Sequence, residues 1–471
     1  MKHDVLQQCA TYARKYLEQL AHEPVHASAN TEELRAAIAQ PLPEYGMNPS
    51  SALDEVVTRT AGGHLGSAGG RFFAWVIGGG LESAVAADWM TAVWDENAAL
   101  STCAPAASIV EETVGEWLKA LLHLPIEASF ALTSGCQMAH FTCLASARCA
   151  VLRDEGWDVN RQGLCGSPKI RILAGRQRHG TIDRAARFLG LGEESIIEVD
   201  TDESGRIRVD AFRIAIEATE APTIVVLNAA DLNTGSFDRF AELIPFAKRH
   251  RAWTHVDGAF GIISRASSDK FPLSQGLELA DSWATDGHKW LNVPFDSGLA
   301  FVRDRESHRD SMALSASYVS STGDVRNAMD WTPEWSRRGR GYALYAALLE
   351  LGQVGVASLV DRCCRHAVAL VDGIGNLPNT EILWRPHLNQ GLIRFLNPHP
   401  DASNWAHDKR TTEMIDAINH TGEAFFSGTT WQGQRAMRVS VVNWRTTDED
   451  VQRTVSAVER VNAGLPPANL S

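Results

Sequence analysis

Lys289 is the residue of this chain best suited to covalent chemistry. It lies between His288 and Trp290, inside segment 281–298, whose composition indicates burial. Lysine is seldom buried unless it is paired or reactive, and a lysine amine held in such a place can form a Schiff base with a carbonyl compound. The segment therefore predicts a lysine that bonds to a carbonyl ligand.

Two further segments supply groups that complement this lysine. Asp257 ends the apolar run Trp253–Asp257, and ligands bind at the carboxyl ends of parallel strands. Segment Thr133–His140 begins with small residues and leads into a helical run through Cys149. The free N–H groups and the dipole at such a helix start favour a dianion such as a phosphate.

Each of these features has an ordinary structural explanation when it stands alone. An aspartate at a strand end is usually a helix cap or a turn former, and a lysine after a histidine usually has no chemical role. Together they match what pyridoxal phosphate requires, which is a Schiff-base lysine, an acid on the ring nitrogen and a phosphate cradle. The sequence therefore predicts this cofactor.

Two other patterns suggest chemistry that the rest of the sequence does not support. His22–His26 matches HExxH, but Pro24 would break the helix that must bring both histidines to one face. The glycine-rich run Gly62–Gly70 lacks the GK[ST] ending of a P-loop and follows no strand. We interpret both as loops of an N-terminal arm and expect no metal site.

The elements that position the lysine alternate along the chain. From about Ser129, short β-branched runs alternate with amphipathic stretches, which predicts an α/β fold with a mostly parallel central sheet. The first hundred residues are helical in period, and the last hundred mix strand-like runs with a capped helix. We expect an N-terminal helical arm (1–95), a large cofactor-binding domain (96–345) and a small C-terminal α+β domain (346–471).

Composition excludes several other classes of protein. Lys and Arg total 44 and Asp and Glu total 57, giving a formal charge of −13 that argues against a sequence-independent nucleic-acid binder. No run approaches the ~20 consecutive apolar residues of a membrane span. The eight cysteines contain no CxxC pair and are interpreted as reduced thiols. A cytoplasmic protein without membrane or nucleic-acid partners is expected.

The segments HVDGAFG (255–261) and HKW (288–290) occur together here, and the chain from about Arg71 to its end resembles the group II pyridoxal-phosphate decarboxylases. That family has the aspartate-aminotransferase-like fold called fold type I. The resemblance implies that Lys289 forms the Schiff base and that Asp257 pairs with the ring nitrogen. It also implies that His179 stacks on the ring and helps to set the substrate carboxylate.

The resemblance implies further cofactor contacts around these three residues. Gln137 departs from the small or hydroxyl residue of many relatives, so its backbone N–H is a better candidate than its side chain. Ser336 would approach the phosphate from the partner subunit of a homodimer whose active sites lie at the interface. The remaining expected contacts are Cys136, Asn233, Thr234, Ala259, Asp286 and His288.

Tyr318 bears on the type of reaction. Relatives that decarboxylate protonate the product carbon with a mobile-loop tyrosine, and relatives that make aldehydes usually carry phenylalanine there. By its position after Lys289, Tyr318 matches this tyrosine and favours decarboxylation of an L-amino acid to an amine and CO2. An aldehyde synthase, a transaminase or a carbon–carbon lyase on the same fold is the alternative.

The substrate class stays open at this point. Aromatic side chains in the segment that shapes the pocket of relatives would suit an aromatic or large apolar substrate, or would equally build the dimer interface. Arg71 would instead meet an acidic side chain. The aromatic residues are Phe72, Phe73, Trp75 and Trp94.

Overall fold

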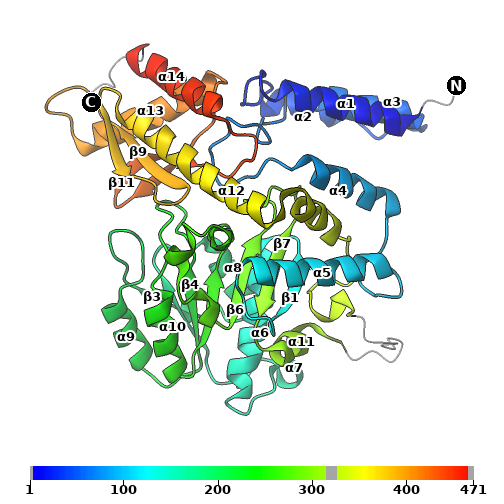
Figure 1. The fold of residues 1–471 in the computed structure, drawn as a ribbon, viewed down its shortest axis with the longest axis vertical. Helices are drawn as coiled ribbons and strands as arrows, with labels where there is room; N and C mark the ends of the chain where they lie inside the picture. Colours follow the sequence, from blue (N-terminus) through cyan, green and yellow to red (C-terminus); the bar gives the residue numbers. More distant parts are fainter. Residues whose placement is uncertain (1–3, 315–325, 465–471) are drawn as a thin grey trace. The chain divides into compact units, whose positions relative to one another are not determined.

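A seven-stranded sheet forms the centre of the larger part of the chain in a computed structural model, which describes residues 4–314 and 326–464. The strand order is β1-β7-β6-β5-β4-β2-β3 (Figure 1). Only β7 runs antiparallel to its neighbours, so the predicted mostly parallel α/β sheet is confirmed. The strands are β1 Ser129–Thr133, β2 Arg171–Gly175, β3 Ile196–Val199, β4 Thr223–Asn228, β5 Trp253–Asp257, β6 Ser282–Asp286 and β7 Gly298–Val302.

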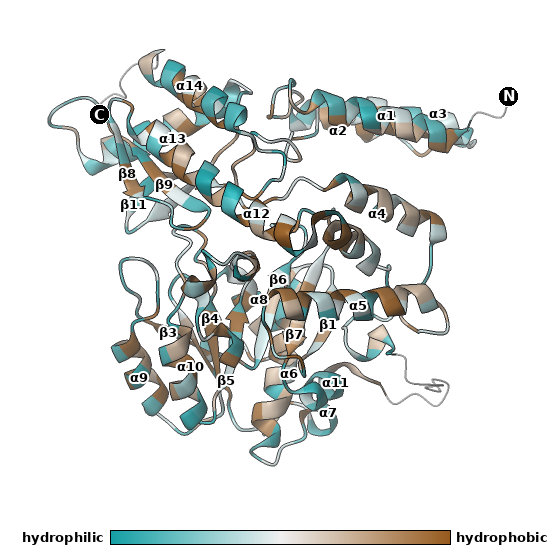
Figure 2. Cartoon of the chain, viewed as in Figure 1, coloured by the Kyte–Doolittle hydropathy of each residue, from teal (hydrophilic) through white to brown (hydrophobic). Residues whose placement is uncertain are grey.

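The central strands are buried because helices cover the sheet. β4 is largely brown in Figure 2, and every residue of β5 is buried, as expected for parallel strands covered on both faces. Helix α6 packs against β5, β6 and β7 and has most of its residues buried. The helices of this part are α4 Glu82–Trp94, α5 Pro105–Leu121, α6 Cys136–Arg153, α7 Val159–Gln162, α8 Gly180–Phe188, α9 Val209–Glu217, α10 Phe240–Arg249 and α11 Arg305–Met312. Short 3-10 helices lie at Glu193–Ser195, Gly261–Ala266, Phe271–Ser274, Leu277–Leu279 and Ala328–Asp330.

The contacts divide the chain into two compact units. One comprises Gly80–Arg365 and Pro386–Gln390, and the other Met1–Gly79, His366–Arg385 and Gly391–Ser471. The second unit contains an antiparallel sheet of order β10-β11-β9-β8, with β9 contributing from Gly391 onward. Its elements are α1 Val5–Gln19, α2 Thr31–Ile38, α3 Pro49–Arg59, β8 Thr380–Trp384, β9 Gln390–Phe395, α13 Asn404–His420, β10 Ser427–Trp431, β11 Gln434–Ser440 and α14 Asp448–Gly464.

Helix α12, Gly341–Gly375, belongs partly to each unit and is interrupted at Gly352, whose φ of 58° is left-handed. Among the described helices it alone is long and apolar enough to cross a membrane by length and composition. Core helices share these properties, and Leu344, Val360 and Leu370 of α12 are fully buried in the protein. The helix is therefore weak evidence for a membrane span.

Candidate active site

Asp286 connects the lysine to the start of helix α6. It ends β6, and Lys289 lies in the turn that follows. Its Oδ2 lies 3.0 Å from Lys289 Nζ, and its Oδ1 accepts a 2.6 Å hydrogen bond from the backbone N–H of Cys136. One buried carboxylate thus joins the predicted Schiff-base lysine to the predicted phosphate cradle.

The charge state of Lys289 follows from its neighbours. Burial favours the neutral amine, but Asp286, with a smaller contribution from Asp257, outweighs burial and raises the pKa of Lys289 above its ordinary value. In the protein without ligand, Lys289 is therefore an ammonium held by Asp286. A carbonyl ligand must compete with this ion pair for the amine.

Two glycines keep the start of α6 open to a ligand. Gly135 precedes the helix in an extended conformation, and a Cβ on Gly298 would collide with the Gly135 backbone. A Cβ on Gly135 would meet His288 and Asp286, so the space before the helix is lined by N–H groups and polar side chains. This cradle, with a lysine beside it, fits the phosphate and aldehyde ends of pyridoxal phosphate.

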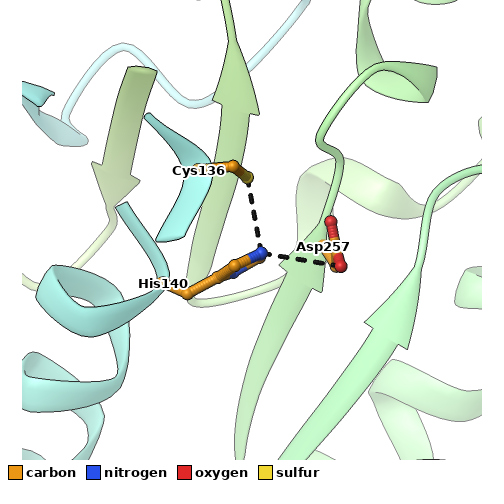
Figure 3. Close-up of side chains that lie close together, drawn as sticks. All are labelled: Cys136, His140 and Asp257. Carbon is orange, nitrogen blue, oxygen red and sulfur yellow. Dashed lines mark hydrogen bonds and ion pairs between the residues drawn. The ribbon is translucent and has the colours of Figure 1, made fainter. Parts of the chain in front are cut away.

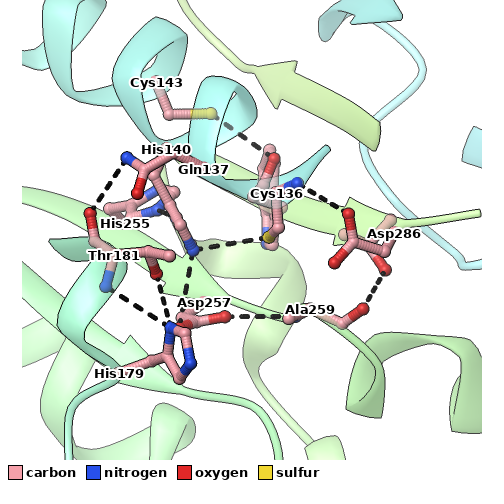
Figure 4. A network of polar contacts seen from close by, with 12 residues as sticks. Cys136, Gln137, His140, Cys143, His179, Thr181, His255, Asp257, Ala259 and Asp286 are labelled. Atoms are coloured by element: carbon pink, nitrogen blue, oxygen red, sulfur yellow. Dashed lines mark hydrogen bonds and ion pairs between the residues drawn. The ribbon is translucent and has the colours of Figure 1, made fainter. Parts of the chain in front are cut away.

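Asp257 lies at the end of the neighbouring strand β5 and is linked to Asp286 through Ala259 (Figure 4). The Ala259 N–H donates to Asp257 Oδ1 over 3.1 Å, and the Ala259 carbonyl accepts the Asp286 N–H over 3.0 Å. Burial acts to raise the pKa of Asp257, but His140, His179 and Lys289 outweigh burial and hold the pKa below its usual range. Asp257 is therefore a buried carboxylate, as a partner for a cationic ring nitrogen must be.

Two buried histidines behind Asp257 did not emerge as site residues from the sequence. His140 Nε2 lies between Cys136 Sγ, at 3.4 Å, and Asp257 Oδ2, at 3.5 Å (Figure 3). His140 Nδ1 lies 2.9 Å from His255 Nε2. The spacing held a signal, because residue 140 is one helical turn after residue 136, and residues 255 and 257 share one face of a strand.

His179 and Gln137 both contact Thr181 near Asp257 (Figure 4). His179 caps α8, is exposed, and its Nδ1 lies 2.9 Å from Thr181 Oγ1. Gln137 Nε2 donates to the Thr181 carbonyl over 3.3 Å, and its buried Oε1 has no partner among the described residues. The Gln137 side chain thus joins α6 to α8, a role the sequence did not predict.

His288 lies on the other side of Asp286. Its Nδ1 accepts the Ser297 N–H over 3.2 Å, and its ring stacks on Phe295 at 4.1 Å between centroids. Burial lowers the pKa of His288. A neutral His288 with Nδ1 as acceptor carries its hydrogen on Nε2, which lies 3.6 Å from Asp286 Oδ1.

The other predicted site residues are Asn233, Thr234, Ser336 and Tyr318. The N–H groups of Asn233 and Thr234 donate to Asp231 Oδ1 over 2.8 and 2.9 Å, and the Thr234 hydroxyl donates to the Ser204 carbonyl. Their loop follows β4, whose last residue pairs with Asp257. Ser336 is exposed, and Tyr318 lies outside the described residues.

The aromatic segment and Arg71 have a different role from the one proposed for a substrate pocket. Arg71 is 2% exposed and donates to four backbone carbonyls, those of Ala21, Glu23, Gly422 and Glu423. This guanidinium is fully engaged in holding its own unit together. The suggestion that Arg71 meets an acidic substrate is therefore corrected.

The neighbouring aromatic side chains also pack internally. Phe72 stacks on Phe425 at 5.3 Å and Phe73 on Phe426 at 5.4 Å, and both residues are buried. Trp75 remains 46% exposed. Phe72 and Phe73 are thus core residues, and they carry no argument about substrate.

Comparison with known proteins agrees with this geometry. The family model described as the pyridoxal-dependent decarboxylase conserved domain matches residues 67–396, more than half of the chain. The chain belongs to the pyridoxal-dependent decarboxylase family. The predicted cofactor, pyridoxal phosphate, and the enzyme class, a carboxy-lyase, are thereby confirmed.

Individual relatives cover most of the chain. An aromatic-L-amino-acid decarboxylase of Bacillus atrophaeus is 25% identical over 94% of this chain and 92% of its own length. An L-2,4-diaminobutyrate decarboxylase of Rhizobium meliloti is 27% identical over 78% of this chain and 71% of its own length. The crystal structure of Oryza sativa TDC with PLP and tryptamine superposes with a TM-score of 0.91 at 20% identity, covering 98% of this chain and 97% of that one. This last similarity confirms the fold.

Proposed function

We propose that this enzyme decarboxylates an aromatic or large apolar L-amino acid to its amine and CO2, with Lys289 and Asp257 as the central residues. The observation that carries the proposal is Asp286, which touches both Lys289 and the start of α6. Pyridoxal phosphate, when bound, supplies a reactive aldehyde and an electron-withdrawing ring. The chain's own residues bind and orient that group and move the protons.

Each residue has a task that follows from its position. Lys289 would hold the aldehyde carbon and later release it to the substrate amine. Asp257 would hold the ring nitrogen as a cation, and the N–H groups at the start of α6 would hold the phosphate. His179, on the exposed side, would cover the ring and orient the substrate carboxylate. Tyr318 would donate the proton that completes the amine.

The remaining predicted contacts complete the cofactor site. Asp286 would lose its pairing with the Lys289 ammonium when the lysine bonds to the aldehyde, and would remain near the phosphate together with His288. Cys136, Gln137 and Ala259 would contribute backbone groups. Asn233 and Thr234 would support the acid beside the ring, and Ser336 of the partner subunit would approach the phosphate.

The substrate class rests on similarity and the subunit organisation on surface chemistry. A relative that matches nearly the whole chain acts on aromatic L-amino acids. Exposed apolar side chains on α4 and α5 support burial against a second copy in a homodimer. These are Trp89, Met90, Val93, Trp94, Ile109 and Trp117. All eight cysteines, which lie among the described residues, are unpaired, which supports a reducing cytoplasmic location.

Product analysis tests the proposal. Cofactor-loaded enzyme would be incubated with aromatic, branched, acidic and basic L-amino acids, with CO2 release and the organic product measured together. Amine and CO2 in equal amounts from the aromatic or large apolar members are expected. Aldehyde with ammonia, or a keto acid without CO2, would contradict the proposed reaction. Release from acidic members alone would contradict the proposed substrate class.

A further inference from the structure

A continuous hydrogen-bonded chain leads from the protein interior to Asp257. Trp253 Nε1 lies 2.9 Å from Ser282 Oγ, Ser282 Oγ lies 2.9 Å from His255 Nδ1, and His255 Nε2 lies 2.9 Å from His140 Nδ1. His140 Nε2 then lies 3.5 Å from Asp257 Oδ2. The four side chains of this network are almost fully buried, so their hydrogens must find partners inside the protein.

The hydrogen bonds of this network can run in one direction, from Trp253 toward Asp257. Indole N–H can only donate, so Trp253 donates to Ser282. If the Ser282 hydroxyl donates to His255 Nδ1, then His255 Nε2–H donates to His140 Nδ1, and the hydrogen of a neutral His140 sits on Nε2. If His140 is instead charged, both of its nitrogens carry hydrogens. In both arrangements an N–H of His140 faces Asp257.

We propose that the chain Trp253–Ser282–His255–His140 aims an N–H at Asp257, keeps it a carboxylate despite its burial, and so keeps the cofactor's ring nitrogen protonated. His140 and His255 are positioning residues here, because they act through Asp257 and need not touch the cofactor. This inference rests on the cofactor role of Asp257 in the proposed function. It concerns the state of the bound cofactor and not the identity of the substrate.

A third arrangement is the competing explanation. In it, Asp257 would carry the proton and donate to His140 Nε2. His140 Nδ1–H would then donate to His255 Nε2, and His255 Nδ1–H to Ser282. The Lys289 ammonium opposes it because a nearby positive charge favours the ionised carboxylate. Cys136 also faces His140 Nε2, but burial raises the pKa of its thiol well above the ordinary value, so it offers only a weak neutral partner.

Substitutions at His140 test whether its side chain acts as a hydrogen-bond donor or only fills space. His140→Leu removes the donor, and His140→Gln can place an amide N–H where Nε2 lies without carrying charge. His308 offers a matched control in the same unit. It is fully buried, its Nδ1 lies 2.7 Å from Ser129 Oγ and its Nε2 lies 2.9 Å from the Trp331 carbonyl. Neither of these partners belongs to the active site.

Two measurements report on the ring nitrogen without using activity. The first is the ¹⁵N NMR shift of pyridoxal phosphate labelled at that nitrogen and bound to each variant. The second is the affinity of each apoprotein for pyridoxal phosphate relative to an analogue with carbon in place of the ring nitrogen. We expect the wild type to bind a protonated ring and to prefer pyridoxal phosphate. His140→Leu should lower that preference about tenfold and shift the resonance toward the unprotonated ring.

The variants decide the proposal together. His140→Gln should keep most of the preference, and His308→Leu should keep all of it. A protonated ring and an unchanged preference in His140→Leu would overturn the proposal, as would an equal loss in His308→Leu. If His140→Leu does not fold, His255→Leu takes its place, with a smaller loss expected and no loss overturning the proposal. A protein that binds a protonated ring but releases no CO2 would contradict the proposed reaction alone.

Discussion

Two lysines of the large unit show how a reactive cation differs from a structural one. Lys119, on α5, is 2% exposed, and its Nζ contacts the Ile126 and Ala128 carbonyls and Glu116 Oε1 at 2.6 to 2.9 Å. Lys289 keeps 22% of its side chain exposed, and of the described residues only Asp286 pairs with its Nζ. An ammonium has three hydrogens. Lys119 has an acceptor for each, and Lys289 does not.

The comparison teaches that the partners, more than burial, distinguish the two roles. Arg71 follows the Lys119 pattern, because backbone carbonyls occupy its guanidinium. Backbone carbonyls cannot leave their places, so a cation that they surround is fixed. A cation that pairs with a single side-chain carboxylate has only that partner to exchange for a ligand. Lys289 is the reactive one on this criterion.

Replacing the reactive lysine should have the largest effect. Lys289→Ala removes both the bond to the cofactor and a proton-transfer group, so decarboxylation by the loaded enzyme should fall by about 10⁴-fold or more. Steady-state assays with the preferred amino acid measure this loss, and a normal unfolding profile shows that the fold is intact. Activity within tenfold of wild type would erase the distinction between the two lysines.

Tyr318→Phe should rank second. Loss of the proton donor is expected to slow amine formation about 10²–10⁴-fold, the usual range for general acid catalysis, while cofactor binding at Lys289 is unchanged. Mass analysis of the products would show whether aldehyde replaces the amine. Unchanged amine production would remove Tyr318 from the reaction.

Replacing the structural lysine should affect stability and spare the chemistry. Lys119→Met leaves the buried Ala128 carbonyl and the partly buried Ile126 carbonyl without their donor, so the free energy of unfolding should fall by about 3 kcal/mol. Urea unfolding of the apoprotein measures this change. The folded fraction should retain wild-type kcat, and a selective loss of kcat with full stability would reverse the comparison.

A smaller effect is expected from pH. Burial lowers the pKa of His255 and of His308 to about 3, below the usual value near 6.5 that the unfolded chain regains. The unfolded state therefore binds protons that the native state cannot, and stability is lost as the pH falls. Each histidine should reduce the free energy of unfolding by about 2 kcal/mol between about pH 7 and pH 5. Replacing His308 with leucine should reduce the slope of stability against pH by one proton.

The sequence predicted the fold best where local pattern and burial agree. Strand β5 has the bounds of the run Trp253–Asp257 that the sequence singles out, and β4 and β7 are buried runs rich in apolar residues. Strand β6, Ser282–Asp286, contains three polar residues and was not predicted as a strand, because its burial comes from neighbouring strands and from α6. Local rules cannot supply such burial.

The site was predictable in its reactive groups and less so in their support. Lys289 and Asp257 stand out because their residue types are costly to bury. His140 and His255 were passed over because their partners are far apart in sequence and are brought together only by packing α6 on β5. Arg71 was misinterpreted for the same reason, since its carbonyl partners include residues more than 300 positions away.

Chemical trapping of the cofactor tests the central claim most directly. Enzyme loaded with pyridoxal phosphate would be reduced with borohydride, which makes a Schiff base permanent, and its peptides would be mapped by mass. We expect one phosphopyridoxyl group per chain, on Lys289, and none in Lys289→Ala. A label on Lys119 or on another lysine, or no label at all, would contradict the assignment of Lys289 as the reactive residue.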